Sequence, residues 1–476
     1  MTWTAVVGVR ARVRVSCAAA LGLALLSLVV IPGQAQASLQ LGLQDRALSG
    51  TSKAQANVAY SAVNAVHGSW VRIPVSWGSI EPERGRYDWS SLDATVRSAS
   101  RHRLAVILQF IRAPGWALGP GPVKPYVSPG SWDPNPTAFA EFVKAAASRY
   151  SGTFPDPLNS GANLSRVRYW EIWNEPNIPG YFSAPDPVGA YRTLLNRAYD
   201  VVKRVHGDNI VVIGGLAPVS PVPGSIPALN FAADLLCLHR VGGGFRASGS
   251  CRQRAKFDVL AFHPYSLDAT PTKHAFKSGD VLVGDTPKVA ALVRAADQLH
   301  TAAPRIRHRI WATEFSWFTN PPNTQVGDSQ AAAARYVAYS MYQMWSSDVS
   351  LVIWLSAMDS PRQGITGGGL YDASGVPKLT KQAFAFPVVA GVRGGHGFVW
   401  GRVPVSHPVR VLVQRRSRNG WSTVARLSAG SDGVFDARFG ARGNGLYRAR
   451  VVGGPTSLAY DSRPIPPRQT HNYQVF

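Results

Sequence analysis

Hydrophobic and polar positions follow two alternating periods along residues 39–385. Short apolar, β-rich runs are followed by stretches whose apolar residues recur at helical spacing. This alternation is typical of βα units built around a parallel sheet. Eight such runs suit an eightfold barrel, which needs at least about 200 residues. The predicted strands are Leu41–Gln44, Trp70–Val75, Leu104–Phe110, Val167–Trp173, Ile210–Gly214, Val259–His263, Ile310–Phe315 and Leu351–Leu355.

Helical patterns lie between these strands, as a barrel of βα units requires. We therefore expect an α/β fold, a (β/α)8 TIM barrel spanning residues 38–387. The predicted helices are Ser91–His102, Pro136–Tyr150, Pro187–His206, Pro287–His300 and Gln330–Ser347.

The pattern changes after Pro387, where helical periodicity ends and short strands recur at intervals of about ten residues. In the run from Val409, alternate residues are Val, while Arg410, Leu412 and Gln414 share the opposite face. This alternation predicts a small antiparallel β-sandwich over residues 388–461, followed by an extended tail, 462–476. Its role stays open between a glycan- or wall-binding module and a spacer that packs on the barrel. The predicted strands are Val409–Arg415, Ser422–Leu427, Val434–Phe439 and Tyr447–Val452.

Residues 1–37 have the composition of a secretory signal peptide. Three arginines precede an apolar run, Cys17–Ile31, and Ala35-Gln36-Ala37 matches the small-x-small cleavage pattern. An uncleaved membrane anchor is the alternative. Removal of the signal leaves Cys237 and Cys251, which we expect to form a disulfide in an oxidising compartment, with two free thiols as the alternative. The sequence thus predicts a secreted protein, extracellular or associated with the cell wall.

The chain is strongly basic, with a formal net charge of +23. A basic surface favours association with an anionic cell-wall polymer or an acidic glycan. Nucleic acid is a poor candidate because no recognition motif accompanies the charge. No Cys/His cluster has metal-ligand spacing, and we expect neither a metal nor another cofactor.

Two stretches 139 residues apart carry the candidate chemistry. Tyr169–Asn177 and Arg309–Phe315 each deliver a carboxylate, Glu175 and Glu314, where a predicted strand gives way to a loop. Active residues of a parallel barrel gather at these carboxyl ends. Retaining glycoside hydrolysis needs two carboxylates about 5–5.5 Å apart. Glu171 would lie about 13 Å deeper along a regular strand, and we interpret it as a structural partner.

These residues resemble those of the clan A glycoside hydrolases, in particular families 5 and 39. Trp173-Asn174-Glu175-Pro176-Asn177 and Thr313-Glu314-Phe315 are similar to family 39. The family 5 pattern matches at Arg72, Asn174, Glu175, His263, Tyr265, Glu314 and Trp354, but Gln109–Arg112 stands where that family usually has a His. The resemblance covers about residues 39–385. It implies a (β/α)8 barrel with Glu175 as acid/base and Glu314 as nucleophile.

The supporting residues have roles that follow from their chemistry. Asn174 would contact the sugar 2-hydroxyl, and Arg72 would keep Glu314 ionised. Tyr265 would donate a hydrogen bond to Glu314. His263 would contact a sugar hydroxyl, Trp354 would form the floor beneath the cleaved sugar, and Trp116 in the loop 114–135 would form a sugar platform. A purely structural role remains the alternative for Arg72, His263, Trp354 and Trp116.

The sequence therefore predicts a secreted retaining glycosidase that cleaves O-glycosidic bonds of a poly- or oligosaccharide. A transglycosylase would use the same two glutamates, with a sugar in place of water as acceptor. A non-catalytic glycan-binding protein on the same scaffold is the other alternative.

Overall fold

A computed structural model describes residues 38–49, 53–121, 125–249, 251, 253–266, 268–359, 367–393, 395–440 and 443–468. The predicted signal peptide, residues 1–37, and the end of the predicted tail, 469–476, lie outside the described residues. Within the described part of the chain, no helix is both long and apolar enough to cross a membrane.

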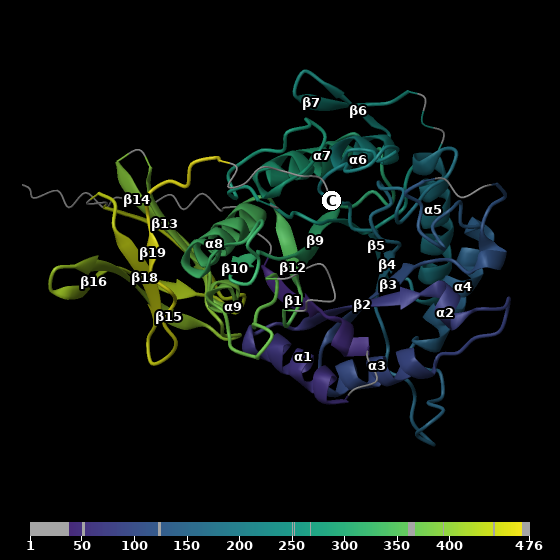
Figure 1. Ribbon diagram of the computed structural model, residues 1–476, viewed down its shortest axis with the longest axis horizontal. Helices are drawn as coiled ribbons and strands as arrows, with labels where there is room; N and C mark the ends of the chain where they lie inside the picture. Colours follow the sequence, from purple (N-terminus) through teal and green to yellow (C-terminus); the bar gives the residue numbers. More distant parts are fainter. Residues whose placement is uncertain are drawn as a thin grey trace, which may run out of the picture. The chain divides into compact units, whose positions relative to one another are not determined.

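Eight parallel strands close into a barrel in the order β1-β12-β9-β8-β5-β4-β3-β2 (Figure 1). Each predicted strand is present, so the predicted barrel is confirmed. The strands are β1 (Gln40–Gln44), β2 (Trp70–Ser76), β3 (Ala105–Ile111), β4 (Tyr169–Ile172), β5 (Ile210–Ile213), β8 (Val259–Phe262), β9 (Arg309–Phe315) and β12 (Val349–Leu355).

Side chains inside the barrel form a small apolar cluster that is separate from the larger core between the strands and the helices. On β12 the two faces alternate, so Leu351 and Ile353 belong to the inner cluster while Trp354 packs in the outer core. The barrel interior is therefore a packed core, as in other TIM barrels. The inner cluster comprises Ile107, Val212, Val259, Ala261, Trp311, Leu351 and Ile353.

Helices surround the barrel, and several begin where the sequence supplies a cap. Asn135 and Asp186 accept hydrogen bonds from the first turns of α4 and α5, and a proline follows each of them. All five predicted helices are present. The helices are α1 (Lys53–Ala65), α2 (Trp77–Ile80), α3 (Ser90–Arg101), α4 (Pro136–Arg149), α5 (Pro187–Val205), α6 (Ala228–Leu235), α7 (Thr286–Gln298), α8 (Gln330–Ser346) and α9 (Leu379–Ala385), with short 3-10 turns at Arg46–Ser49, Gly115–Ala117 and Val283–Asp285.

The sequence pattern missed three of these longer elements, α1, α6 and α9. Helices α6 and α9 have only eight and seven residues, too few for a clear period. The hairpin formed by β6 (Leu238–Val241) and β7 (Gly244–Ala247) was also not predicted. Its ends are joined by a disulfide between Cys237 and Cys251, with a Cα–Cα distance of 5.5 Å, which confirms the predicted pairing.

The C-terminal region is an antiparallel β-sandwich, as predicted. Phe439 and Tyr447, with ring centroids 5.9 Å apart, make contact between its two sheets. One sheet has the order β13-β14-β17 and the other β16-β15-β18-β19. The strands are β13 (Val388–Arg393), β14 (His396–Arg402), β15 (Val409–Ser417), β16 (Gly420–Ala429), β17 (Val434–Gly440), β18 (Leu446–Val451) and β19 (Tyr460–Asp461); the barrel loops add β10 (Thr319–Asn320) and β11 (Asp328–Ser329).

The sheet β13-β14-β17 packs against the barrel helix α8. Trp400 on β14 lies 5.5 Å from the rings of both Tyr342 and Trp345. Arg402 donates a hydrogen bond to the carbonyl of Leu39, at the start of the barrel, over 2.9 Å. This sheet therefore packs on the barrel, which is one of the two roles left open for the sandwich.

Candidate active site

Glu175 lies just past the end of β4, where the sequence predicts that a strand gives way to a loop. Strand β4 ends at Ile172, and both Trp173 and Glu175 have positive φ angles, 73° and 41°. The Trp173 indole donates to the carbonyl of Tyr181 at 2.6 Å, and the Glu175 amide donates to the carbonyl of Gly215 at 2.9 Å. These bonds hold a sparsely populated backbone conformation of the kind that gathers at functional sites. They turn the Glu175 side chain toward β8 and β9.

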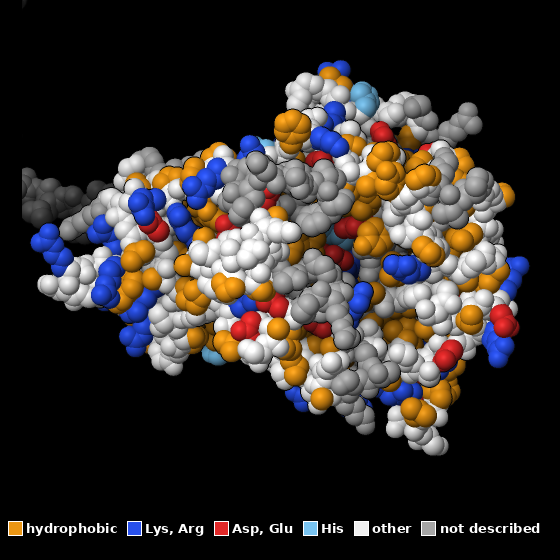
Figure 2. All heavy atoms as spheres, in the orientation of Figure 1, with side chains coloured by type: hydrophobic (Ala, Val, Ile, Leu, Met, Phe, Trp, Pro, Cys, Tyr) orange, Lys and Arg blue, Asp and Glu red, His pale blue; other side chains and the backbone are white. Residues whose placement is uncertain are grey.

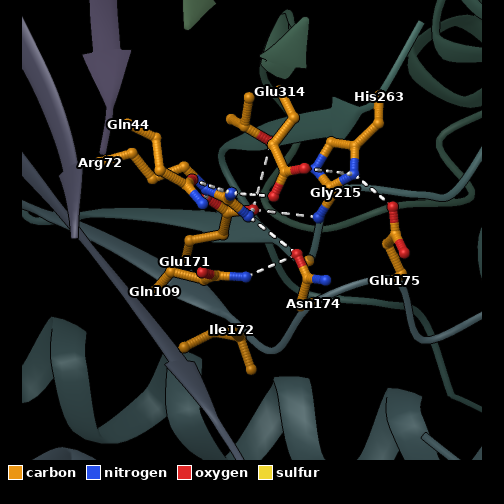
Figure 3. Close-up of polar contacts among 12 residues, drawn as sticks. Gln44, Arg72, Gln109, Glu171, Ile172, Asn174, Glu175, Gly215, His263 and Glu314 are labelled. Carbon is orange, nitrogen blue, oxygen red and sulfur yellow. Dashed lines mark hydrogen bonds and ion pairs between the residues drawn. The ribbon is translucent and has the colours of Figure 1, made fainter. Parts of the chain in front are cut away.

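Glu175 and Glu314 meet at His263, which lies just after β8 (Figure 3). His263 Nδ1 lies 2.7 Å from Glu175 Oε1 and 3.8 Å from Glu314 Oε2. One oxygen from each glutamate and one ring nitrogen of His263 all lie within 4.8 Å of one another. The glutamate side chains are 12% and 13% exposed, whereas His263 is fully buried. The carboxylates therefore converge at the edge of one solvent-accessible site.

Arg72 on β2 connects Glu314 to a second, deeper carboxylate, Glu171. Its guanidinium bonds Glu314 Oε1 at 2.6 Å and forms two bonds to Glu171, at 2.7 and 2.9 Å. The same guanidinium donates to Gln44. Glu171 also accepts from the Gly215 amide at 3.0 Å and the Thr313 hydroxyl at 3.2 Å. Glu171 thus has the structural role expected of it. It shares the Arg72 guanidinium with Glu314. Strand β4 ends at Ile172, so the regular strand from which a depth of about 13 Å below Glu175 was expected does not continue to Glu175.

Asn174 has its amide orientation fixed by two donors. Its Oδ1 accepts from Arg72 at 3.0 Å and from Gln109 at 2.6 Å. The Asn174 NH2 group is therefore the end left to donate, which suits a contact to a sugar hydroxyl oxygen. Gln109, in the stretch 109–112 where family 5 usually has a His, completes this arrangement.

The two glutamates differ in the direction of their pKa shifts. Burial, together with the charge of Glu314, raises the pKa of Glu175 against the opposing effect of His263. Burial also favours a higher pKa for Glu314, but His263, Arg72 and the hydroxyl of Tyr265 outweigh it and lower the pKa of that carboxyl. Tyr265 donates to Glu314 Oε2 at 3.1 Å, as predicted. One group therefore holds its proton to higher pH while the other stays ionised.

Glu175, His263 and Glu314 have the spacing of a three-ligand metal site. However, both Glu314 oxygens are engaged, by Arg72 and by Tyr265, and His263 Nδ1 is bonded to Glu175. A cation here would lie beside the permanent charge of Arg72. The donor set fits proton transfer better than metal binding.

Two predicted sugar contacts are corrected by the structure. Trp354 is fully buried, donates to the Gly368 carbonyl at 3.0 Å and packs on Phe384 of α9, so it cannot form the floor beneath a sugar. Side chains point alternately into and out of the barrel along β12, and Trp354 occupies an outward-pointing position. His263 is likewise fully buried, and its Nδ1 is bonded to Glu175, so no part of the ring is exposed to a sugar hydroxyl.

Trp116 lies on the surface and stays a prediction. It is 36% exposed, donates to the Glu81 carbonyl at 3.3 Å and has its ring edge against Trp77 at 5.7 Å. These contacts fix the ring without linking it to Glu175 or Glu314.

Sequence reasoning missed several polar groups of the site. Tyr181 is 37% exposed, and the charge of Glu175, with burial and Glu314, raises its pKa while Arg112 opposes the shift. Gly215 is needed because a Cβ there would lie 2.1 Å from His263 Nε2. The sequence could have pointed to Gln44, Gln109 and Gly215 by their location, because all three lie at or near the carboxyl ends of barrel strands, where active residues gather.

No protein-family model and no curated protein sequence matches this chain. Solved structures of family 39 glycoside hydrolases are similar to it. One from the gut symbiont Bacteroides cellulosilyticus WH2 has 16% identity, covers 85% of this chain and 79% of its own, and gives a TM-score of 0.53. A β-xylosidase of that family from Caulobacter crescentus has 17% identity, 80% and 83% coverage and a TM-score of 0.51.

A third structure, of a family 39 enzyme from Xanthomonas axonopodis pv. citri, has 15% identity, covers 85% of this chain and 92% of its own, and gives a TM-score of 0.50. At these identities the likeness shows the fold. The protein therefore has the fold of the family 39 glycoside hydrolases, one of the two families that its motifs resemble.

Proposed function

We propose that this protein is a secreted retaining glycoside hydrolase that cleaves O-glycosidic bonds of a poly- or oligosaccharide. The observation that carries the proposal is the convergence of Glu175 and Glu314, with one oxygen of each within 4.8 Å, and the opposite directions of their pKa shifts. Such a short separation suits the retaining mechanism, since an inverting pair leaves about 6.5–9.5 Å for a water molecule.

In the first step, Glu314 attacks the anomeric carbon while Glu175 protonates the departing oxygen. Arg72 and Tyr265 keep Glu314 ionised, and burial keeps the proton on Glu175. In the second step, Glu175 accepts a proton from water, which displaces Glu314 and releases the sugar. His263, bonded to Glu175, positions that carboxyl through both steps. Asn174 donates its NH2 group to a hydroxyl of the bound sugar.

Two glutamate variants test these roles. Glu314→Gln should lower kcat by about four orders of magnitude or more while the fold persists. Glu175→Ala should retain far more activity on an aryl glycoside with a good leaving group than on a natural glycoside, because only the latter needs a proton donor. Glu83→Gln, which alters an exposed glutamate of the same barrel, is the matched control. Full activity of Glu314→Gln, or equal losses of Glu175→Ala on both substrates, would contradict the assignment.

Product analysis tests the reaction type. The sugar first released should keep its anomeric configuration, which proton NMR of the fresh product detects. An added acceptor sugar separates hydrolysis from transglycosylation, since a transglycosylase would yield mainly the coupled product. The absence of turnover on every member of a glycan panel, together with tight glycan binding, would favour the non-catalytic alternative. Recovery of the mature protein outside the producing cell, beginning after Ala37, tests secretion.

A further inference from the structure

The sandwich sheet β16-β15-β18-β19 carries a row of arginines that the proposed catalytic reaction does not use. Strands β15, β16 and β18 contain six arginines and no acidic residue. Pairing places five of them on one face, because Leu412 lies opposite both Arg450 and Arg426, and Gln414 lies opposite Arg448. Arg410 and Arg416 continue the same face along β15. We call these five residues, Arg410, Arg416, Arg426, Arg448 and Arg450, the basic face.

The opposite side of the same strands is the sandwich core, which fixes the direction of the basic face. Val411, Val413, Ala449 and Val451 are all buried. A one-residue change of register would bury the arginines, so the apolar alternation locks them outward. Figure 2 shows Lys and Arg side chains gathered over the sandwich, at the left of the view. The other sheet, β13-β14-β17, is the one that packs on α8, so the basic face is not the surface that joins the sandwich to the barrel.

The arginines of the basic face lie beside one another, and in the part of the chain that the structure describes none of the five forms an ion pair. Burial lowers the pKa of Arg448, and the positive charges of Arg450 and Arg416 lower it further. Neighbouring cations without counter-charges repel one another, and a bound polyanion would relieve that repulsion.

An aromatic ring and a glutamine hold two of these guanidinium groups in place. The Trp421 ring lies under Arg448 at 4.2 Å and near Arg416 at 5.6 Å. Arg448 Nε also donates to Gln414 Oε1 at 2.9 Å. Planar guanidinium groups bind carboxylate and sulfate oxygens in pairs, and an immobilised fork loses less entropy when it binds. The face extends about 20 Å along β15 and about 10 Å across three strands, enough for several sugar rings.

We propose that the basic face binds a polysaccharide that bears carboxylate or sulfate groups, and so holds the protein on an anionic glycan. The choice of a polysaccharide over another polyanion rests on the proposed glycosidase function and on the predicted export of the chain. Binding is measured without turnover, so either proposal can fail without the other.

The test measures binding of the full-length mature protein to immobilised polygalacturonate, which carries carboxylates, and to heparin, which carries sulfates. Neutral dextran, duplex DNA and vesicles of anionic lipid complete the set. We expect binding to at least one anionic polysaccharide that weakens as NaCl rises from about 20 mM to about 500 mM. Binding to only one of the two anionic polysaccharides shows whether the basic face recognises carboxylate or sulfate groups. Binding to both shows that it recognises either group.

Replacing all five arginines of the basic face with Gln should weaken this binding about tenfold or more. The matched control replaces five exposed barrel arginines, Arg101, Arg103, Arg204, Arg246 and Arg305, with Gln and should change it less than about twofold, although it removes the same charge. If the fivefold variant does not fold, the four exposed positions, Arg410, Arg416, Arg426 and Arg450, are changed without Arg448 and should weaken binding in the same direction. Both sets should leave turnover of a small aryl glycoside unchanged.

Three results would overturn the proposal. The first is an equal loss in the control variant, which would show that only net charge matters. The second is unchanged binding in the basic-face variant. The third is tighter binding to DNA or to vesicles than to either polysaccharide, which would assign the face to a nucleic acid or a membrane surface.

Discussion

Arginine is used in opposite ways in the barrel and in the sandwich. Arg72 is fully buried and divides its guanidinium among Glu171, Glu314, Asn174 and Gln44. The arginines of the basic face lie on the surface beside other arginines, with no acid on their strands. The barrel surrounds a cation with carboxylates, and that cation helps to lower the pKa of one of them, Glu314. Among the residues that the structure describes, the sandwich gives these cations no acidic partner and so leaves their charge available to an external anion.

The comparison separates two sources of specificity. Inside the barrel, a buried charged or polar group without a partner costs free energy. The side chains of the site are therefore held in one arrangement. On the sandwich, water screens each charge, and only the sum of several contacts has a measurable effect.

Arg72→Met should destabilise the protein by about 3–5 kcal/mol, because it leaves Glu171 and Glu314 buried without their cation. The matched change on the basic face, Arg450→Met, should stay within about 0.5 kcal/mol. Urea unfolding at neutral pH measures both values. Equal effects of the two substitutions would remove the contrast between the regions.

Gly215→Ala should lower kcat about a hundredfold, since the new Cβ would lie 2.1 Å from His263 Nε2 and displace the histidine from Glu175. Gly207→Ala is the control, because no atom lies within 4 Å of a Cβ at that position. Steady-state kinetics on an aryl glycoside compares the two. A Gly215→Ala enzyme with normal kcat would show that the His263–Glu175 contact is dispensable.

Tyr265→Phe should narrow the pH profile of kcat/KM from the acidic side. Glu314 must be ionised and Glu175 protonated, so activity rises with pH through the pKa of Glu314 and falls through that of Glu175. Tyr265 helps His263 and Arg72 to lower the pKa of Glu314 against burial, so its loss should move the acidic limb to higher pH. Tyr126→Phe, on an exposed loop, should leave both limbs in place. A shift of the alkaline limb alone would mean that Tyr265 acts on Glu175.

Arg450→Gln should slightly stabilise the protein at low ionic strength, by about 0.2–0.5 kcal/mol, because it relieves repulsion within the basic face. The effect should disappear near 1 M NaCl, where charges are screened beyond about 3 Å. Urea midpoints at low and high salt provide the measurement. Destabilisation at low salt would show that Arg450 has an acidic partner in solution.

Much of the fold follows from local patterns in the sequence. The predicted barrel strands were found because each is a short apolar run between turn signals. The predicted long helices were found because their apolar residues recur over three or more turns. Helices α6 and α9 were missed because a helix of two turns is formed by tertiary packing rather than by its own sequence.

The catalytic candidates were also accessible from the sequence, since an acidic residue at the carboxyl end of a barrel strand has few structural reasons to be there. Trp354 shows the limit of that approach. A shift of one residue on a strand moves a side chain from the barrel interior to the outer core, and only the register of β12 decides which face Trp354 takes.

Local patterns in the sequence are enough to predict the order of the strands and most helices, the alternation that puts arginines on one face of a sandwich strand, and the two candidate glutamates. Folding is needed to show that Glu175 bonds His263, that Arg72 bonds both Glu171 and Glu314, and that arginines from three strands share one face. The difference comes from distance along the chain. Periodicity records what neighbouring residues do, whereas pKa values and charge clusters depend on groups that only folding brings within a few ångströms.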